Sequence, residues 1–375
     1  MAVDDGDHSL PVMPFIRAGV ARTVARVALA VLGLAPVLAS VARAQQAAGP
    51  SIDAAQRVHI QPPWRLSVRA DNDAFNFWRS ITDRPDKEYT NGDQVIIEIA
   101  GAPWWGKRFA KRRAPCDGTE GADARCLTTA LAIGQDMYTP RPGHEPGMVP
   151  NWRDDRPYAA WLYAGAEARV ASERSLRTVG LELGVIGPPA FGEFAQRTAH
   201  KLSGVYSREP VGWNTQIGFE PGVVLTARNT RRFAAQTSSG NVVADFAPHV
   251  GASVGNVLTE GETGFQGRIG LNLSNPWWTS GWRSRRALEL YLSGGARGEA
   301  VARNITLDGN TLGADRRVDR VPLVGEYAVG VGGRFRGLVA EWRAITRSRE
   351  YDTGPAGHAY STLFMSYEVP ARGSH

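Results

Sequence analysis

Hydrophobic and polar residues alternate along most of this chain. In the stretch 178–185, Val and Leu occupy the odd positions, and Thr, Gly and Glu occupy the even ones. A period of two is typical of a β-strand with one apolar and one polar face. The same alternation recurs at 65–71, 265–272 and 288–293. The pattern therefore predicts an all-β protein.

Twelve segments are predicted as strands, most of them close to ten residues long. They are 65–75, 89–100, 127–138, 158–170, 177–187, 211–227, 243–256, 262–272, 287–301, 320–335, 338–347 and 358–368. An even number of antiparallel strands can close into a barrel with both termini on one side. We find no internal repeat, so we expect one barrel domain over 64–375, preceded by a periplasmic segment over 45–63.

The amino terminus has the pattern of a cleaved secretory signal over residues 1–44. Arg17, Arg22 and Arg26 precede an apolar stretch over 27–39, and the small-residue motif Ala42-Arg43-Ala44 follows it. This stretch is too short to span a bilayer. A membrane anchor or a core helix is the alternative, but the closely following A-x-A motif favours the signal. We therefore expect the mature chain to leave the cytoplasm.

Alternation alone does not distinguish a water-soluble sandwich from a membrane barrel, because both need strands with two different faces. The secretory signal, the strand length and the Trp and Tyr residues near strand ends favour a transmembrane outer-membrane barrel. The 42 glycines and 33 aromatic residues also suit short strands and tight turns. The formal charge of +6 is spread over single basic residues, so no nucleic-acid partner is expected.

The chain has two cysteines, Cys116 and Cys126, ten positions apart in a turn-like stretch with Pro115 and Gly118. In an exported protein this spacing favours a local disulfide over a metal site or a nucleophile.

With the amino terminus in the periplasm, the unusual polar motifs fall on the external rim. They are Asp71-Asn72-Asp73, Tyr89-Thr90-Asn91-Gly92, the stretch 134–140 with Gln135 and Thr139, Asp155-Arg156, Arg303 and Arg347. Carboxylate and amide oxygens at one barrel mouth are what a cation site or a polar active site needs. The alternatives are that Asn91-Gly92 is an ordinary turn, that Asp155-Arg156 is an ion pair fixing a loop, and that Arg303 and Arg347 line the lumen. The opposite rim holds the cysteines and Trp277-Trp278.

A general base for hydrolysis near neutral pH is usually a histidine. Among the histidines, only His144 is expected in an external loop next to the polar motifs, with Glu145 beside it. The alternative is that His144 is merely a solvent-exposed loop residue. The chain lacks the G-x-S-x-G, H-E-x-x-H and P-loop motifs, which removes support for serine-hydrolase, zincin and nucleotide-binding readings.

Taken in order, these motifs resemble the outer-membrane lipid A 3′-O-deacylase family from about Trp64 to Tyr367. The further pieces are Gly212-Trp213, Glu220-Pro221, Gly255-Asn256, Asn304 and the stretch 307–311. The resemblance implies a twelve-stranded barrel that hydrolyses the 3′ acyloxyacyl ester of lipid A in the outer leaflet, with a divalent cation, usually calcium. It places Thr139 where we align the family's histidine, and His144 follows five residues later.

By position, the resemblance assigns a role to each motif. Asn72 and Asp73 hold the cation or the oxyanion; Thr90 and Gln135 contact substrate or water; His144 and Glu145 supply the base; and Thr139, Arg156 and Arg303 bind substrate. The expected partner is lipopolysaccharide, and the barrel is expected to be monomeric. Two other functions remain open at this stage. One is a catalytically weak or inactive barrel that binds lipopolysaccharide or is structural, and the other, disfavoured by the small lumen, is a passive pore.

Overall fold

The computed structural model describes residues 64–76, 88–102, 114–116, 125–144, 146–203, 211–277, 288–313 and 315–369. The expected signal over 1–44, the segment 45–63 and Glu145 lie outside the described residues. The chain divides into two compact units, one of Val58–Glu193 with Val211–His375 and one of Met1–Arg57 with Phe194–Pro210. The first unit contains every strand described below.

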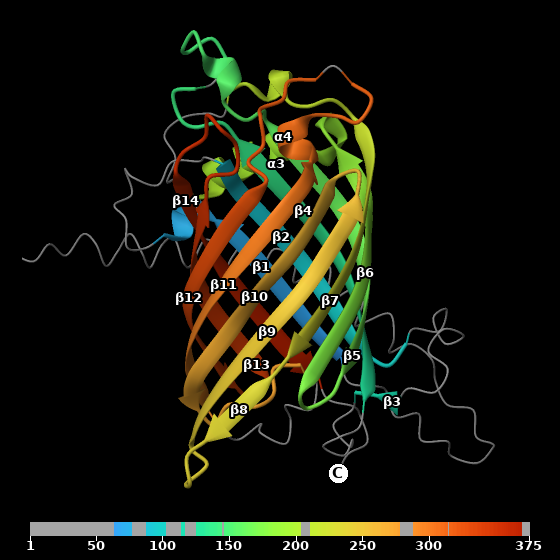
Figure 1. Cartoon of the computed structure of the whole chain (residues 1–375), viewed down its shortest axis with the longest axis vertical. Helices are drawn as coiled ribbons and strands as arrows, with labels where there is room; N and C mark the ends of the chain where they lie inside the picture. Colours follow the sequence, from blue (N-terminus) through green and yellow to red (C-terminus); the bar gives the residue numbers. More distant parts are fainter. Residues whose placement is uncertain are drawn as a thin grey trace, which may run out of the picture. The chain divides into compact units, whose positions relative to one another are not determined.

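Within the first unit, twelve long antiparallel strands form a closed barrel. They are β1 (Trp64–Asn72), β2 (Glu88–Ala100), β4 (Cys126–Thr139), β5 (Ala159–Ala171), β6 (Ser175–Ile186), β7 (Glu220–Arg231), β9 (Val242–Gly255), β10 (Leu258–Leu271), β11 (Glu289–Asn304), β12 (Leu323–Phe335), β13 (Leu338–Ser348) and β14 (Gly357–Val369). The barrel closes because β1 pairs with both β2 and β14, as Figure 1 shows with the blue strand between teal and red ones. The predicted twelve-stranded antiparallel barrel is confirmed.

Shorter elements lie at the two ends of the barrel (Figure 1). At the end carrying the longer loops are η1 (Asp73–Phe75), η3 (Trp152–Asp154), η4 (Pro188–Ala190), η5 (Trp213–Thr215) and α4 (Ile305–Asp308). We call this end the external rim, because outer-membrane barrels have their longer loops outside. At the opposite end β3 (Ala114–Pro115) pairs with β4, and β8 (Phe233–Gln236) pairs with β9. The helix α3 (Gly192–Ser203) falls mainly in the second unit, and no described helix has the length and apolar character to cross a membrane.

One predicted strand begins too early. The sixth was expected over 211–227, but β7 begins at Glu220, and residues 213–215 form η5 instead. Gly212 has a φ of 104°, which ends extended backbone there, and the Trp213 ring packs 5.0 Å from the Tyr158 ring. This packing turns the chain inward before the strand starts.

The strands present their apolar residues outward, as expected for a wall facing lipid. Val179, Leu181 and Leu183 of β6 are exposed, and so are Val329 and Val331 of β12. The same alternation that gave the strands therefore places the apolar face on the outside of the barrel.

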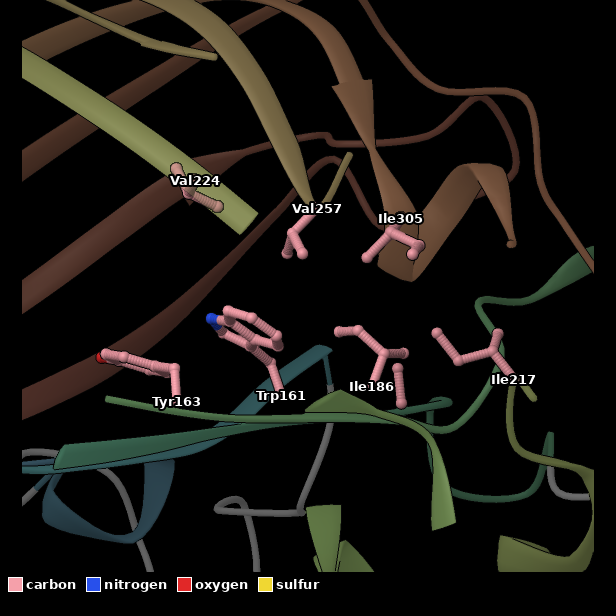
Figure 2. Packing of buried hydrophobic residues seen from close by; sticks show 8 residues of the cluster. Trp161, Tyr163, Ile186, Ile217, Val224, Val257 and Ile305 are labelled. Atoms are coloured by element: carbon pink, nitrogen blue, oxygen red, sulfur yellow. The ribbon is translucent and has the colours of Figure 1, made fainter. Parts of the chain in front are cut away.

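Inside the barrel, the external end is filled and the remaining lumen is polar. Trp161, Ile186, Ile217, Val257 and Ile305 pack together across the lumen below the external rim (Figure 2). Further toward the opposite end lies a cavity of about 570 Å³ whose wall carries arginines and carboxylates. Several of these charges pair across neighbouring strands, as Arg65 does with Glu98 and Glu368.

The opposite end is fixed by the predicted disulfide. Cys116 and Cys126 are bonded, with their Cα atoms 4.8 Å apart, and both are fully buried. They pack with Ala171 and with the partly buried Leu176 and Trp277, as expected for that rim. Trp278 lies outside the described residues.

Candidate active site at the external rim

Four polar residues interrupt the apolar outer face where β1, β2 and β4 reach the external rim. Asn72 lies opposite Asn91 in the sheet, and Asp93 lies opposite Gln135. Nδ2 of Asn72 donates to Oδ1 of Asn91 over 3.0 Å, and Nδ2 of Asn91 donates to Asp93 over 2.8 Å. We call these residues, Asn72, Asn91, Asp93 and Gln135, the outer-face polar patch.

The strand phase shows that this patch faces outward. Asp93 alternates with the exposed Val95 and Ile97, and Gln135 alternates with the exposed Leu131 and Ile133. Polar side chains on the lipid-facing wall of a barrel are costly unless they serve a function or lie near the interface. Asp93 was missed by the sequence reasoning, although its place in the alternating series 91–97 was visible.

The expected turn at Asn91-Gly92 is wrong, because both residues lie inside β2. The strand needs glycine at position 92 for another reason. A Cβ there would lie 1.7 Å from the Tyr89 hydroxyl, which sits 2.9 Å from Asp71 and 3.0 Å from Asp136 on the inner side. The Tyr89 ring thus crosses beneath the patch and joins three strands.

Two of the expected contact residues bond to each other. The hydroxyls of Thr90 and Thr139 are 2.6 Å apart, and both side chains are buried. Asp73 is also buried, in η1, immediately after the exposed end of β1. Of the residues expected to hold a cation, Asn72 therefore lies in the outer-face polar patch, whereas the Asp73 side chain is enclosed.

The loop after β6 reaches the patch through Gln135. Its Nε2 donates to the carbonyl oxygen of Ala190, the last residue of η4. This fixes the residues just before α3 beside the patch.

Arg156 lies in a buried polar network inside the external rim. Its guanidinium is wholly enclosed and donates to Glu88 over 3.1 Å and to Glu350 over 3.2 Å. The Arg156 carbon Cζ lies 4.6 Å from the centre of the Tyr138 ring. The side chain therefore offers no surface to a ligand in this structure, which disfavours substrate contact.

The alternative that Asp155 and Arg156 form an ion pair with each other is wrong. Asp155 accepts a hydrogen bond from the Arg156 backbone N–H, but its side chain pairs with Arg141 over 2.8 Å and with the Tyr351 hydroxyl. The same hydroxyl lies 2.9 Å from Glu88, which links Asp155 to the rest of the network. The network therefore ties the loop after β4 to the loop after β13.

Electrostatics hold the loop carboxylates of this network ionised. Burial by itself raises the pKa of Glu350, but the Arg347 and Arg156 guanidiniums oppose it and bring the value to about 2. Burial likewise acts to raise the pKa of Asp155, yet hydrogen bonds from Tyr351 and Arg141 bring it below its usual range. Both carboxylates are therefore charged at neutral pH.

His144 borders this network. Its Nδ1 lies 3.7 Å from Asp155, and the side chain is 28% exposed. Within the described residues, no hydrogen bond or ion pair joins His144 to the outer-face polar patch. Glu145, its expected support, lies outside them.

That His144 is the only histidine in an external loop next to the polar motifs stays a prediction. His200 lies on α3, in the segment between the external ends of β6 and β7. Gln196 is buried, and His200, one helical turn later, shares its face of α3. The signal was present in the sequence as the i, i+4 spacing of these two residues, which the strand-only reading of this segment overlooked.

Arg303 lies in a different sector, at the end of β11. Its Nε donates to the Asn256 carbonyl over 2.6 Å, and Nη2 donates to Thr311 over 2.9 Å. The motifs therefore share the external rim, as predicted. The polar patch faces outward, Arg156 and its partners face inward, and Arg303 contacts the β9–β10 turn.

The donor chemistry of the patch suits a hard cation. Amide and carboxylate oxygens of Asn72, Asn91, Asp93 and Gln135 are of the kind that calcium prefers. Among the described residues, however, no group of three or more His, Cys, Asp or Glu side chains could hold a metal ion. A cation here would therefore depend largely on neutral amide oxygens.

Comparison with known proteins decides the family. A family model described as "Outer membrane protein LpxR" matches residues 29–369. The chain belongs to this family. The match confirms the resemblance to outer-membrane lipid A deacylases and places the protein in the bacterial outer membrane. No curated protein sequence matches the chain.

Solved structures agree with the fold. LpxR from Salmonella typhimurium is 22% identical, with a TM-score of 0.62 over 81% of this chain and 99% of that one. The beta domain of the Bordetella autotransporter BrkA is 11% identical, with a TM-score of 0.40 over 83% of this chain and 99% of that one. The first likeness supports the barrel architecture alone, and the second is too weak to carry an argument.

Proposed function

We propose that this protein hydrolyses the 3′-O-linked acyloxyacyl ester of lipid A in the outer leaflet. The observation that carries the proposal is the outer-face polar patch, because it places Asn72, Asp93 and Gln135 on the lipid-facing wall at the external rim. An enzyme acting on a membrane lipid needs its polar groups on that wall, where an ester of the outer leaflet can reach them without leaving the membrane. Groups inside the lumen would not meet the substrate.

We further propose that the patch holds calcium. Asn72, Asn91, Asp93 and Gln135 would supply the oxygen ligands, with the buried Asp73 adding negative charge below them. A bound calcium ion would act as a Lewis acid on the ester carbonyl. The patch offers one exposed carboxylate, so we expect affinity in the weak, roughly 10⁻⁴–10⁻³ M range of extracellular calcium sites.

The hydrolytic step needs a base that removes a proton from the attacking water. His144, with Glu145 beside it, is the proposed base, and its Nδ1 lies 3.7 Å from the Asp155 carboxylate. After the histidine takes a proton from water, the water oxygen bonds to the ester carbonyl carbon, the bond between that carbon and the sugar oxygen breaks, and the protonated histidine returns the proton to the sugar oxygen.

We assign positioning roles to four other residues. The Thr90–Thr139 contact fixes β2 against β4 below the patch. Arg156 holds the loops over the barrel through its buried carboxylate partners. Arg303, the fourth, fixes the loop after α4, although its partly exposed edge leaves room for a contact with lipopolysaccharide phosphate.

Mass spectrometry of lipid A tests the proposal. Outer membranes containing the wild-type protein or the Asn72→Ala or His144→Ala variant are incubated in calcium or in chelator. We expect calcium-dependent loss of one acyloxyacyl unit with the wild type, and none with Asn72→Ala. Loss of product in His144→Ala would support His144 as the base, full activity would exclude it, and Asp352→Asn, an exposed loop change, serves as the matched control.

A folded wild-type barrel that leaves lipid A intact in every condition would overturn the deacylase. It would favour the alternative, a barrel of the same fold that binds lipopolysaccharide without turnover. Product formation that persists in chelator would remove calcium from the proposal and leave the hydrolase.

A further inference from the structure

The loop that follows α4 presents an isolated leucine. The Leu312 side chain is 98% exposed, the highest value among the large hydrophobic residues described. Fully exposing a leucine forgoes about 1.5–3 kcal/mol relative to burying it. A singly exposed leucine is common on protein surfaces, so an apolar environment for Leu312 is inferred from the residues beside it.

The loop is held firmly on the residues before this leucine. Thr311 donates to the Glu220 carboxylate through its backbone N–H over 2.7 Å and through its hydroxyl over 2.6 Å. Arg303 donates to the Gly309 carbonyl over 3.1 Å and to the Thr311 hydroxyl over 2.9 Å. Leu312 is therefore presented by a fixed backbone rather than by a free tail.

These contacts place the tip against the external end of β7. Figure 1 shows the orange loop running from α4 across to the top of this strand. Phe219, the residue before β7, is 58% exposed, and its carbonyl accepts a hydrogen bond from Asn310. Phe219 is in phase with the outward Val223 and Leu225, so it continues the apolar outer face beyond the strand.

The polar groups beneath the tip satisfy one another. Nδ2 of Asn256 donates to Glu220 over 2.6 Å, and Nε of Arg303 donates to the Asn256 carbonyl over 2.6 Å. Together with Thr311 they form a connected network, in which Oδ1 of the neighbouring Asn310 is buried without a hydrogen-bond partner. Such a network can lie at the edge of a bilayer at lower cost than unpaired charges could.

We propose that Phe219 and Leu312 form a lipid-inserted tip that enters the acyl-chain region of the outer leaflet beside β7. The occupant is lipid because the tip is continuous with the apolar outer face of β6 and β7, which already faces the membrane. Beside β7, the tip would extend the lipid-facing surface of the protein beyond the external end of the strand. It would also set the depth at which the barrel is inserted in the outer membrane. The proposal does not depend on hydrolysis.

Spin labelling tests the proposal on the whole mature protein. Both cysteines of the chain are used in the Cys116–Cys126 disulfide, so an introduced cysteine gives one labelling site. Nitroxide is attached to Leu312→Cys or Phe219→Cys in vesicles of phosphatidylethanolamine and phosphatidylglycerol. The rate at which the nitroxide collides with oxygen, which concentrates among the acyl chains, is compared with its rate of collision with a nickel chelate dissolved in the water on both sides of the membrane.

Two matched sites calibrate the result. Val329→Cys on the outer face of β12 gives the lipid value, and Asp352→Cys in an external loop gives the water value. We expect the labels at 312 and 219 to show an oxygen-to-nickel ratio several-fold above that at 352 and close to that at 329. Heat-dependent migration on gels confirms that each labelled barrel is folded.

Two outcomes would overturn the proposal. A ratio at 312 equal to that at 352 would place the tip in water. A high ratio that falls when labelled protein is diluted with unlabelled protein in excess lipid, together with dipolar broadening before dilution, would assign the contact to a second copy of the chain.

Discussion

At the scale of single residues, function and fold depend on where the strand alternation is broken. Asn72 and Asp93 stand at outward positions that strand phase would give to apolar side chains, and they define the outer-face polar patch. Gly92 stands at an inward position because Tyr89 needs the space. The sequence shows where the alternation of apolar and polar residues is interrupted, but it does not show why. Only the structure shows which side chains lie next to each of these positions.

Replacing Asp93 by Asn tests the patch directly. The substitution preserves shape and removes the one exposed carboxylate of the patch, so we expect the calcium concentration for half-maximal lipid A deacylation to rise about tenfold or more. A calcium titration of product formation measures this. Asp352→Asn is the control, and we expect its calcium requirement to equal that of the wild type. If Asp93→Asn also needs the same calcium concentration as the wild type, Asp93 is not a calcium ligand.

Replacing Gly92 by Ala tests the close approach of Tyr89. The new Cβ would lie 1.7 Å from the Tyr89 hydroxyl oxygen, so the ring must move, and we expect a loss of about 1–3 kcal/mol in the free energy of unfolding. Urea unfolding of the detergent-solubilised barrel measures it. Tyr89→Phe in the same chain should recover part of the loss, whereas Gly261→Ala, with no atom within 4 Å of the new Cβ, should be neutral. Equal losses at 92 and 261 would contradict the steric explanation.

At the scale of elements, the strands were largely predictable and the loops were not. The alternation located twelve strands to within a few residues, because a membrane wall imposes the same two-faced pattern on each of them. It failed at 211–219 and at 187–203, where η5 and α3 replace an expected strand and an expected loop. In those segments long-range packing, such as Trp213 on Tyr158, overrides the local pattern.

The loop network around Arg156 makes a prediction about stability. Arg156→Leu removes a buried cation and leaves Glu88 and Glu350 without it, so we expect a loss of about 3–5 kcal/mol in the free energy of unfolding. Arg153→Leu, an exposed neighbour, is the control. Urea unfolding of both variants measures the difference, and a neutral Arg156 variant would show that the network adds no stability.

The same network predicts a dependence of stability on pH. The pKa of Glu350 lies at about 2 in the folded protein, below its ordinary value of 4.5, so its contribution is present above pH 4.5 and disappears as the pH falls toward 2. A shift of this size corresponds to about 3 kcal/mol. Urea unfolding at a series of pH values should show this loss in the wild type. In Glu350→Gln, the free energy of unfolding should depend less on pH. Identical slopes for the two proteins would remove Glu350 as the source.

At the scale of the whole barrel, the lumen is closed at its external end. The apolar cluster around Trp161 and Ile217 and the network around Arg156 both lie there, above a cavity of about 570 Å³. This arrangement disfavours a passive pore. It also means that chemistry on outer-leaflet lipid would take place on the outer wall and not in the lumen.

Conductance across a planar bilayer tests this closure. The wild-type barrel should show no stable ion current, because the packed external end leaves no continuous water path. Trp161→Ala combined with Ile217→Ala should produce measurable openings, while Val329→Ala on the lipid face should remain silent. Steady current through the wild type would restore the pore as a function.

The sequence by itself determined the fold class, the strand number, the disulfide and the rim on which the polar motifs meet. These follow from local rules, since alternation, chain direction and cysteine spacing are each visible along the chain. Only the tertiary structure decided which way each motif faces. Arg156 turned out to be buried, Asp93 proved to lie opposite Gln135, and His200 was found on a helix, because these outcomes depend on strand register and on contacts between distant loops.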